Sequence, residues 1–403
     1  MPWTLRMLLL FTLAGALFQL YVALKTINAI AILTSSRRRK ILLVAIAILF
    51  WLFLHPLLIF GSYFLGSGRL AQTFQSSNRM LDALITYPFW AGIILAIQVA
   101  LFLLVIDIMR LLLFPIYKKH RLRWQKAQAW LTLILVFAGT AYVAARIYHD
   151  TFTVRIRETE LSIADLPKEL EGFRIAQIAD VQADGRTNGP KLQNYIDTVN
   201  SLKPDLILYG GDLVTSGTDY IDAGADSMGK MEAKHGIYAC LGDHDFFSDR
   251  DRVTRSLERN GITVLDNVAT LVPVGSTYIS LTGVTNVYRT RPTMGALETI
   301  ERQRPRGPVN VLLTHQPSEW LIDYAAEQNY DLLVAGHTHG GQIVFPLPGF
   351  LLTGSSFETR YVTGFYNAGS LIVSINNGLG LTLAPIRYHA PAEVTLISLT
   401  GAK

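Results

Sequence analysis

Four apolar stretches in the first 150 residues place the strongest constraint on what this chain can fold into. Each is close to the roughly 20 residues that a helix needs to cross a bilayer. They cover residues 7–33, 41–65, 88–114 and 127–147. The second stretch contains no Asp, Glu, Lys or Arg. The sequence therefore predicts a transmembrane anchor with four helices over residues 1–150.

The charges are divided unevenly between the two halves of the 403-residue chain. Residues 1–150 hold 15 Lys and Arg against 3 acidic residues, a net charge of +12, whereas residues 151–403 hold 21 against 28, a net charge of −7. Basic residues that flank apolar segments are typical of membrane proteins, and a mildly acidic half disfavours polyanion binding. We expect a lipid bilayer as a partner and no nucleic acid, while the oligomeric state stays open. The single cysteine, Cys240, excludes an intramolecular disulfide.

The loops between the apolar stretches predict the orientation in the membrane. Residues 37–40 and 118–126 are strongly basic, whereas residues 66–87 carry only two arginines and one aspartate. Because basic loops stay in the cytoplasm, four spans place everything after residue 150 outside. The expected location is a cell (inner) membrane with a periplasmic or extracellular C-terminal domain. The alternatives are a cytoplasmic domain and a cleaved signal peptide at the first stretch.

Within the third stretch, Asp107 and Arg110 are interpreted as an i,i+3 pair, with an ion site as the alternative.

From residue 151 the pattern changes to short β-rich runs, each followed by polar residues. Strands are expected at 152–163, 262–266, 277–283, 370–375 and 392–399, and helices at 189–202 and 249–260. Five further runs end in the segments ADVQ, GGDLV, LGDHD, LTHQP and GHTHGGQ. Ligands gather at the carboxyl ends of strands in open α/β sheets. The polar residues in these segments are Asp180, Gln182, Asp212, Asp243, His244, His315, His337 and His339.

Oxygen donors mixed with imidazoles, without a thiolate, are suited to Mn²⁺, Fe or Zn²⁺ and not to a structural zinc site. Two adjacent cations need about seven or eight ligands, which this set supplies. Such a pair neutralises an anionic phosphate and activates a hydroxide for in-line attack. The predicted cofactors are two divalent metal ions.

The order of these segments resembles that of the calcineurin-like metallophosphoesterases, over about residues 173–342. The tail at 378–397, GLGLTLAPIRYHAPAEVTLI, is similar to a membrane-anchored bacterial branch grouped with the UDP-diacylglucosamine hydrolases. The resemblance implies an α/β domain at 151–403 with two packed mixed sheets flanked by helices. It also implies a metal-dependent phosphoric ester hydrolase of the phosphodiesterase or pyrophosphatase type.

The resemblance also implies individual roles. Asp180, Gln182 and His339 would serve the first metal, and Asp212 would bridge both metals. Asp243, His315 and His337 would serve the second metal. His244 would lie beside the phosphate, as a charge stabiliser or as the proton donor to the leaving oxygen.

Two positions depart from the family pattern, which usually has His at 182 and Asn at 243. The amide oxygen of Gln182 is a harder donor than imidazole and favours Mn²⁺ or Mg²⁺ over Zn²⁺. Asp243 adds a negative charge that would reduce the Lewis acidity of the metal pair. The alternative to an enzyme is therefore a catalytically impaired metal-binding sensor or scaffold in the membrane.

The substrate is predicted only as a class. Residues 343–366 follow the last metal segment and are apolar. They form either a lip that dips into the outer leaflet or holds an acyl chain, or an ordinary packed β-hairpin. A lipid-linked phosphate substrate is one expectation. Arg360 is interpreted as a solvated turn residue, with a phosphate contact as the alternative.

Overall fold

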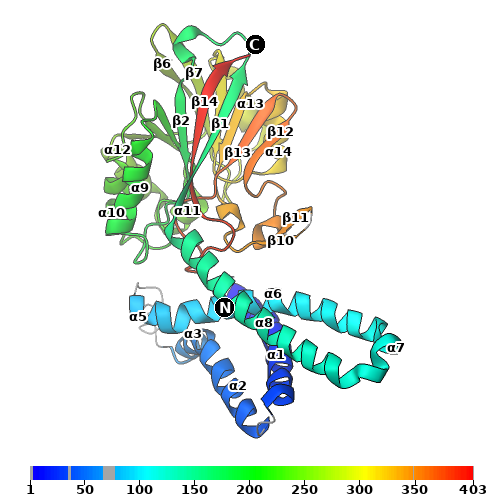
Figure 1. Ribbon diagram of the computed structural model, residues 1–403. Coiled ribbons are helices and arrows are strands. Elements are labelled where there is room, and N and C mark those ends of the chain that lie inside the picture. Colours follow the sequence, from blue (N-terminus) through cyan, green and yellow to red (C-terminus); the bar gives the residue numbers. More distant parts are fainter. Residues whose placement is uncertain (1–2, 35–37, 67–77, 348, 403) are drawn as a thin grey trace. The chain divides into compact units, whose positions relative to one another are not determined.

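The computed structural model describes residues 3–34, 38–66, 78–347 and 349–402. The chain divides into two compact units, Met1–Tyr148 and His149–Lys403. The N-terminal unit is helical, whereas the C-terminal unit holds two large β-sheets (Figure 1).

The N-terminal unit contains long apolar helices and their short connections. Its elements are α1 (Trp3–Thr34), α2 (Arg38–Leu52), α3 (Leu54–Phe64), α5 (Arg79–Leu81), η1 (Asp82–Thr86), α6 (Tyr87–Leu112), α7 (Phe114–Tyr117), η2 (Lys118–His120) and α8 (Arg121–Phe152). Three segments of the described residues are long and apolar enough to cross a membrane: Leu5–Thr34, Asp82–Leu112 and Phe114–Phe152.

The second predicted stretch is not one straight helix. Helices α2 and α3 are bent by 52° relative to each other, so the pair is either a broken span or a re-entrant loop. Pro56 explains the bend, because it has no N–H to donate to the carbonyl of Leu52, the last residue of α2. The predicted count of four spans is therefore not confirmed, and the described residues contain three unbroken candidate spans.

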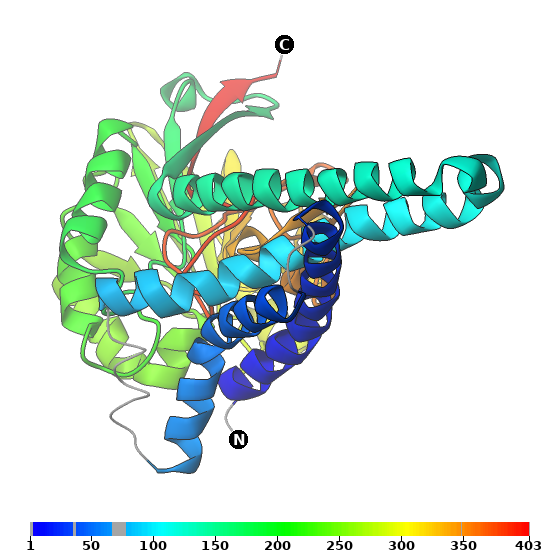
Figure 2. The same cartoon turned by 60° about the horizontal axis from the view of Figure 1, so that its bottom comes forward.

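Helices α1, α6 and α8 pack around one apolar cluster in this unit (Figure 2). The cluster contains Val22, Ala96, Val99, Ala100 and Leu103, with Leu135 and Val136 against it. Beside it, Lys25 Nζ donates to Asp107 Oδ1 at 2.6 Å, and Tyr21 Oη donates to Asp107 Oδ2 at 2.7 Å. The predicted pairing of Asp107 with Arg110 is present only as a charge interaction beyond ion-pair distance. A cation on a neighbouring helix takes that place, and α1 contacts α6 through it.

The C-terminal unit is built from short strands and helices. Its helices are η3 (Lys168–Leu170), α9 (Gly189–Ser201), α10 (Ile221–Met228), α11 (Asp243–Ser248), α12 (Arg250–Arg259), α13 (Met294–Gln303), α14 (Glu319–Glu327), η4 (His339–Gly341) and η5 (Gly354–Phe357). Its strands are β1 (Val154–Ile163), β2 (Arg174–Ile178), β3 (Leu206–Tyr209), β4 (Ile237–Ala239), β5 (Ile262–Val264), β6 (Val268–Val274), β7 (Thr277–Val284), β8 (Val309–Thr314), β9 (Leu332–Ala335), β10 (Phe345–Leu347), β11 (Phe350–Leu352), β12 (Gly364–Ala368), β13 (Leu371–Ile375) and β14 (Ala392–Gly401).

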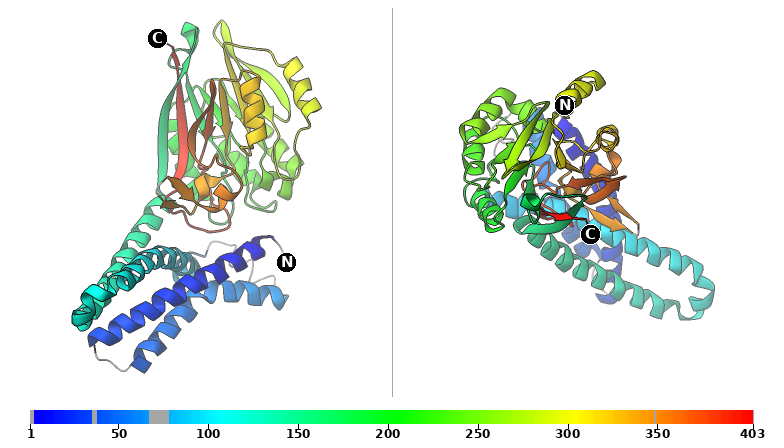
Figure 3. Two further views of the ribbon diagram at one scale, coloured as in Figure 1. Left: turned by 90° about the vertical axis from the view of Figure 1, so that its right-hand side faces the viewer. Right: turned by 90° about the horizontal axis from the view of Figure 1, so that it is seen from above.

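Two six-stranded mixed sheets pack face to face, with helices on their outer faces (Figure 3). One sheet has the order β1-β14-β2-β3-β4-β5 and the other β12-β13-β9-β8-β7-β6. The core between the sheets includes Ile175, Leu208, Leu281, Val311 and Val334, all fully buried. The predicted α/β architecture of two packed mixed sheets is confirmed, and strands covered on both faces explain the continuous apolar runs in the sequence.

The parallel strands fix where the polar segments meet. Strands β2, β3, β4 and β5 are parallel neighbours, as are β7, β8 and β9. Parallel neighbours end at one edge of a sheet, so the segments after β2, β3, β4, β8 and β9 come together there. The expected strands at 370–375 and 392–399 correspond to β13 and β14, which complete the two sheets.

Candidate metal centre

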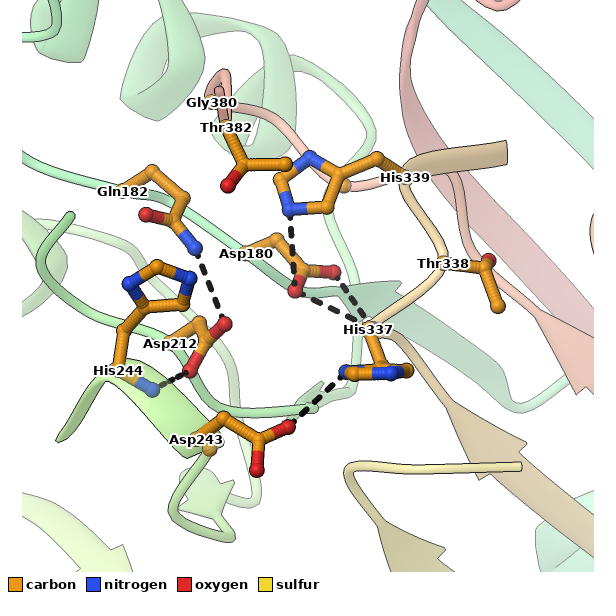
Figure 4. Close-up of polar contacts among 12 residues, drawn as sticks. Asp180, Gln182, Asp212, Asp243, His244, His337, Thr338, His339, Gly380 and Thr382 are labelled. Atoms are coloured by element: carbon orange, nitrogen blue, oxygen red, sulfur yellow. Dashed lines mark hydrogen bonds and ion pairs between the residues drawn. The ribbon is translucent and has the colours of Figure 1, made fainter. Parts of the chain in front are cut away.

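Most of the side chains predicted as metal ligands point toward one another in Figure 4. Asp180 and Gln182 follow β2, Asp212 follows β3, and Asp243 begins α11 after β4. His315 follows β8, and His337 and His339 follow β9. Both sheets therefore contribute, although the residues are up to 159 positions apart in the chain.

The backbone is strained at this cluster. Five of the seven predicted ligands have positive φ angles: Asp180 at 50°, Gln182 at 51°, Asp212 at 62°, His337 at 70° and His339 at 52°. A positive φ angle destabilises a residue that has a Cβ by on the order of 1 kcal/mol or more. Residues strained in this way concentrate at functional sites. The fold holds these side chains in place at an energetic cost that packing alone does not explain.

One group of possible ligands is formed by Asp243, His315 and His337, whose donor atoms all lie within 4.8 Å of one another. Asp243 Oδ2 lies 3.0 Å from His337 Nδ1 and 3.4 Å from His315 Nε2. His315 Nδ1 donates to the Gly210 carbonyl at 2.7 Å, which leaves Nε2 directed at the group. Burial alone would raise the pKa of Asp243, but the hydrogen bonds from His315 and His337 outweigh it and lower that pKa.

A second group consists of Asp180, Asp212 and His315, again within 4.8 Å. His339 Nε2 lies 3.6 Å from Asp180 Oδ1, and Gln182 Nε2 donates to Asp212 Oδ2 at 3.0 Å. Burial raises the pKa of Asp180 to about 7, and the charge of Asp212 adds to this effect. Carboxylates this close and this buried are unfavourable unless cations accompany them.

Two buried side-chain atoms indicate whether a metal ion fits this group of residues. Gln182 Oε1 and His339 Nδ1 are buried and have no hydrogen-bond partner among the described residues. A buried acceptor without a partner costs about 1–3 kcal/mol. The amide oxygen of Gln182 is a suitable donor for a hard divalent ion, so the residues present fit a metal site made of oxygen and imidazole donors.

His244 lies at the border of this cluster and is half-buried. Its N–H donates to Asp212 Oδ1 at 2.7 Å, and its Nδ1 donates to the Thr215 carbonyl at 2.5 Å. These two bonds fix the ring and leave Nε2 available to a substrate. The structure places His244 next to Asp212, and its role beside the phosphate stays a prediction.

Two glycines are required by close approach. A Cβ at Gly242 would lie 2.2 Å from Asp212 Oδ1, and a Cβ at Gly336 would lie 2.5 Å from Asp180 Oδ2. Both values are shorter than any real Cβ contact, so larger residues would displace the ligands.

Sequence reasoning missed several residues that support the cluster. Asp245 accepts three backbone N–H groups, from Asp212, Leu213 and Gly242, at 2.8–2.9 Å. Gln316 Nε2 donates to Asp243 Oδ2 at 2.7 Å. Both residues lie inside the quoted segments LGDHD and LTHQP, so adjacency to a ligand was the available signal.

Three further supporting residues lie outside those segments. Tyr288 donates its N–H to Asp243 Oδ1 at 2.6 Å, and Glu358 Oε1 lies 3.3 Å from His337 Nε2. Arg387 is fully buried and donates to five carbonyls, those of His339, Asn377, Gly378, Gly380 and Ala390. No local pattern in the sequence distinguishes these residues, because only the tertiary fold brings them to the site.

The segment after the last ligand is a hairpin of its own. Strands β10 and β11 pair only with each other, and Phe350 is 57% exposed. Residue 348, at the turn, lies outside the described residues. The predicted hairpin is present: the rings of Phe345 and Tyr388 lie 6.1 Å apart, whereas Phe350 is exposed, so the lip and the packed hairpin both stay predictions. Arg360 contacts Tyr361 Oη at 2.8 Å and has a side chain that is 66% exposed, so it is a surface residue as interpreted.

Comparisons with known proteins agree with this geometry. The sequence profile of the calcineurin-like phosphoesterase family matches residues 173–341. An uncharacterized metallophosphoesterase of Bacillus subtilis, YkuE, is 30% identical over 268 residues, which cover 65% of this chain and 91% of that protein.

Two other relatives are more distant. A transmembrane protein with a metallophosphoesterase domain from Danio rerio is 26% identical over 62% of this chain and 58% of that protein. An uncharacterized metallophosphoesterase of Helicobacter pylori is 25% identical over 69% of this chain and 72% of that protein. The matched family, the convergent Asp and His groups and the apolar helices lead to one conclusion: this chain belongs to the calcineurin-like metallophosphoesterases and joins such a domain to membrane-type helices.

Proposed function

We propose that this protein is a membrane-anchored phosphoesterase that hydrolyses a phosphodiester or pyrophosphate bond with two divalent cations. The observation that carries the proposal is the pair of Asp and His groups, each within 4.8 Å, that share His315. Adjacent cation sites are the recurring arrangement of enzymes that cleave phosphate esters by in-line displacement.

The proposed ligand assignment follows the two groups. Asp180, Gln182 and His339 would hold one cation, and Asp243, His315 and His337 would hold the other. Asp212 would bridge them, and its position between Gln182 and His315 supports that role. The unpartnered Gln182 Oε1 supports amide ligation and hence Mn²⁺ or Mg²⁺ over Zn²⁺.

Divalent cations bound here would supply Lewis-acid chemistry, neutralising phosphate oxygens and lowering the pKa of water. The chain itself would do the rest. Asp245 fixes the backbone on both sides of Asp212, and Thr215 orients His244. His244 Nε2 would then donate a proton or a hydrogen bond to the leaving oxygen as charge develops there.

Exposed apolar side chains around the site support a lipid-linked substrate. Phe247, whose ring lies 6.3 Å from that of His244, is 58% exposed. Phe357 precedes Glu358 and is 84% exposed. The β10–β11 hairpin is tied to the site because Thr353 donates to the Gly341 carbonyl at 2.7 Å, two residues from His339. Exposed apolar surface concentrated at a site indicates an apolar ligand or a membrane.

The start of the C-terminal unit is hydrogen-bonded to the segment around Arg387. Asp150 Oδ2 accepts from the His389 N–H at 2.6 Å, and Thr151 Oγ1 accepts from the Arg387 N–H at 2.9 Å. Arg387 in turn donates to the carbonyl of His339 at 3.2 Å. Thr151, near the end of α8, is therefore linked through Arg387 to the backbone of His339.

For the topology, we propose four crossings and a domain outside the cytoplasm. The end of α1, the start of α2, the end of α6 and the start of α8 line one cavity in the N-terminal unit. The basic segments 37–40 and 118–126 then lie on the same side of the membrane, so the chain must cross it an even number of times between them. Because α6 accounts for one crossing, the α2–α3 pair would account for the other. A reporter fused after Lys403 tests this. A re-entrant pair would place the domain in the cytoplasm, where a nucleotide-linked lipid substrate would be available.

The decisive experiment uses the full chain in detergent with Mn²⁺. We expect hydrolysis of a chromogenic phosphodiester and of lipid-linked phosphates, and loss of both in Asp212→Ala. Replacing Phe350 and Leu351 with Ser should reduce turnover of the lipid substrates only, and an equal loss on both substrates would refute the lipid role of the hairpin. If the wild-type protein binds Mn²⁺ but cleaves none of these esters, the sensor or scaffold alternative gains support from the presence of Asp243.

A further inference from the structure

The N-terminal unit contains a cavity of about 400 Å³ that the proposed hydrolase does not use. It is lined by the ends of α1, α2, α6 and α8, next to the two basic loops. A volume of this size is in the range of small-molecule sites in proteins. The cavity lies at the loop ends of membrane-type helices. Lipid headgroups lie at the same depth.

The charged residues that line the cavity are Lys25, Arg38 and Arg110, and no acidic residue lines it. Lys25 is held by Asp107, whose oxygens also accept from Tyr21 and Gln128. Asp107 is thus bonded on both oxygens, and Lys25 is its ion-pair partner, while the charge of Arg110 acts on it from beyond ion-pair distance. Arg38 and Arg110 have no carboxylate within ion-pair distance in the part of the chain that the structure describes.

Neutral polar groups complete the lining. Arg38 Nη2 donates to Asn28 Oδ1 at 3.1 Å, which ties the guanidinium to α1. Asn28, Gln125 and Thr132 add amide and hydroxyl groups to the wall. Counting Asp107, the formal charge around the cavity is +2, and guanidinium groups bind phosphate oxygens with two parallel hydrogen bonds.

From this arrangement we infer that the cavity binds a phosphate group, carried by the headgroup of an anionic lipid or by a small soluble compound. Arg38 and Arg110 bind the phosphate oxygens, and Asn28, Gln125 and Thr132 bind hydroxyl groups next to them. Basic cavities between membrane helices recognise anionic headgroups in this manner. The inference concerns the N-terminal unit alone and does not depend on the hydrolase being active.

The test is lipid retention by the purified full chain, measured by native mass spectrometry with phosphatidic acid and with phosphatidylcholine. We expect retention of phosphatidic acid alone. We expect Arg110→Gln and Arg38→Gln to weaken it by about fivefold each, because one basic group near a membrane surface contributes on the order of 1 kcal/mol. Arg123→Gln is the matched control, since Arg123 belongs to the same basic segment but does not line the cavity.

The remaining measurements distinguish a lipid phosphate from a soluble one and control for misfolding of the variants. Competition by inorganic phosphate, with the same dependence on both arginines, would identify a soluble phosphate compound as the ligand. Absence of competition would identify the lipid. Arg110→Lys keeps the charge and the fold, and it should retain more lipid than Arg110→Gln. Equal retention of phosphatidylcholine, or equal losses in Arg110→Gln, Arg38→Gln and Arg123→Gln, would overturn the inference.

Discussion

Asp245 offers the sharpest test of how the metal cluster is held. Its buried carboxylate accepts N–H groups from Asp212 at 2.9 Å, Leu213 at 2.8 Å and Gly242 at 2.9 Å. Asp245→Ala would leave three buried donors without an acceptor. At about 1–3 kcal/mol for each donor, the free energy of unfolding of the C-terminal unit should fall by at least about 3 kcal/mol.

The assay has to separate this unit from the helical one. Hydrogen exchange of peptides that cover β2 and β3, followed as a function of urea in the metal-free full chain, reports on opening of the sheet. Asp245→Asn keeps one acceptor oxygen and should lose less than Asp245→Ala.

Asp249→Ala is the comparison for an ordinary hydrogen bond. Asp249 caps α12 by accepting from the Arg252 N–H at 3.0 Å, so its loss should cost about 1 kcal/mol. If Asp245→Ala costs no more than Asp249→Ala, the reasoning that Asp245 holds the ligand loops is refuted.

Three further predictions follow from the same geometry. Gln182→His should move the metal preference toward Zn²⁺, measured by competition between Mn²⁺ and Zn²⁺ with elemental analysis; an unchanged ratio would show that Gln182 is not a ligand. Metal-free protein should lose stability as pH rises from about 4 to about 7. Burial raises the folded-state pKa of both Asp180 and Asp245 to about 7 from an ordinary 3.8, so the folded state holds more protons in that window. Saturating Mn²⁺ should flatten this dependence, and a metal-free stability that increases over the same window would contradict it. Arg387→Met would remove five hydrogen bonds to carbonyls around His339 and should weaken metal binding by about tenfold or more, whereas an unchanged affinity would limit Arg387 to a purely structural role.

The ligands were accessible to sequence reasoning because each follows an apolar run directly. Asp180, Asp212 and His315 stand one to three residues beyond a strand end, and parallel strands that end together need no further information to bring them to one edge. The supporting residues were not accessible in this way. Tyr288, Glu358 and Arg387 occur in connecting segments, and nothing local marks them as neighbours of the cluster.

The membrane half shows the same division. Composition identified the apolar stretches, because hydropathy is a local property of the chain. It did not identify the 52° bend between α2 and α3 or the pairing of Lys25 with Asp107, which joins residues 82 positions apart.

Sequence patterns alone predicted the two-part organisation, the α/β class of the second part and the residues that we propose as ligands of the cations. These depend on residue type, spacing and the ends of strands. The tertiary structure was needed to show which buried groups hold those residues, where Asp107 finds its cation and which helix ends line the basic cavity. Those contacts join segments far apart in the chain, and their energies arise only when folding removes water from between them.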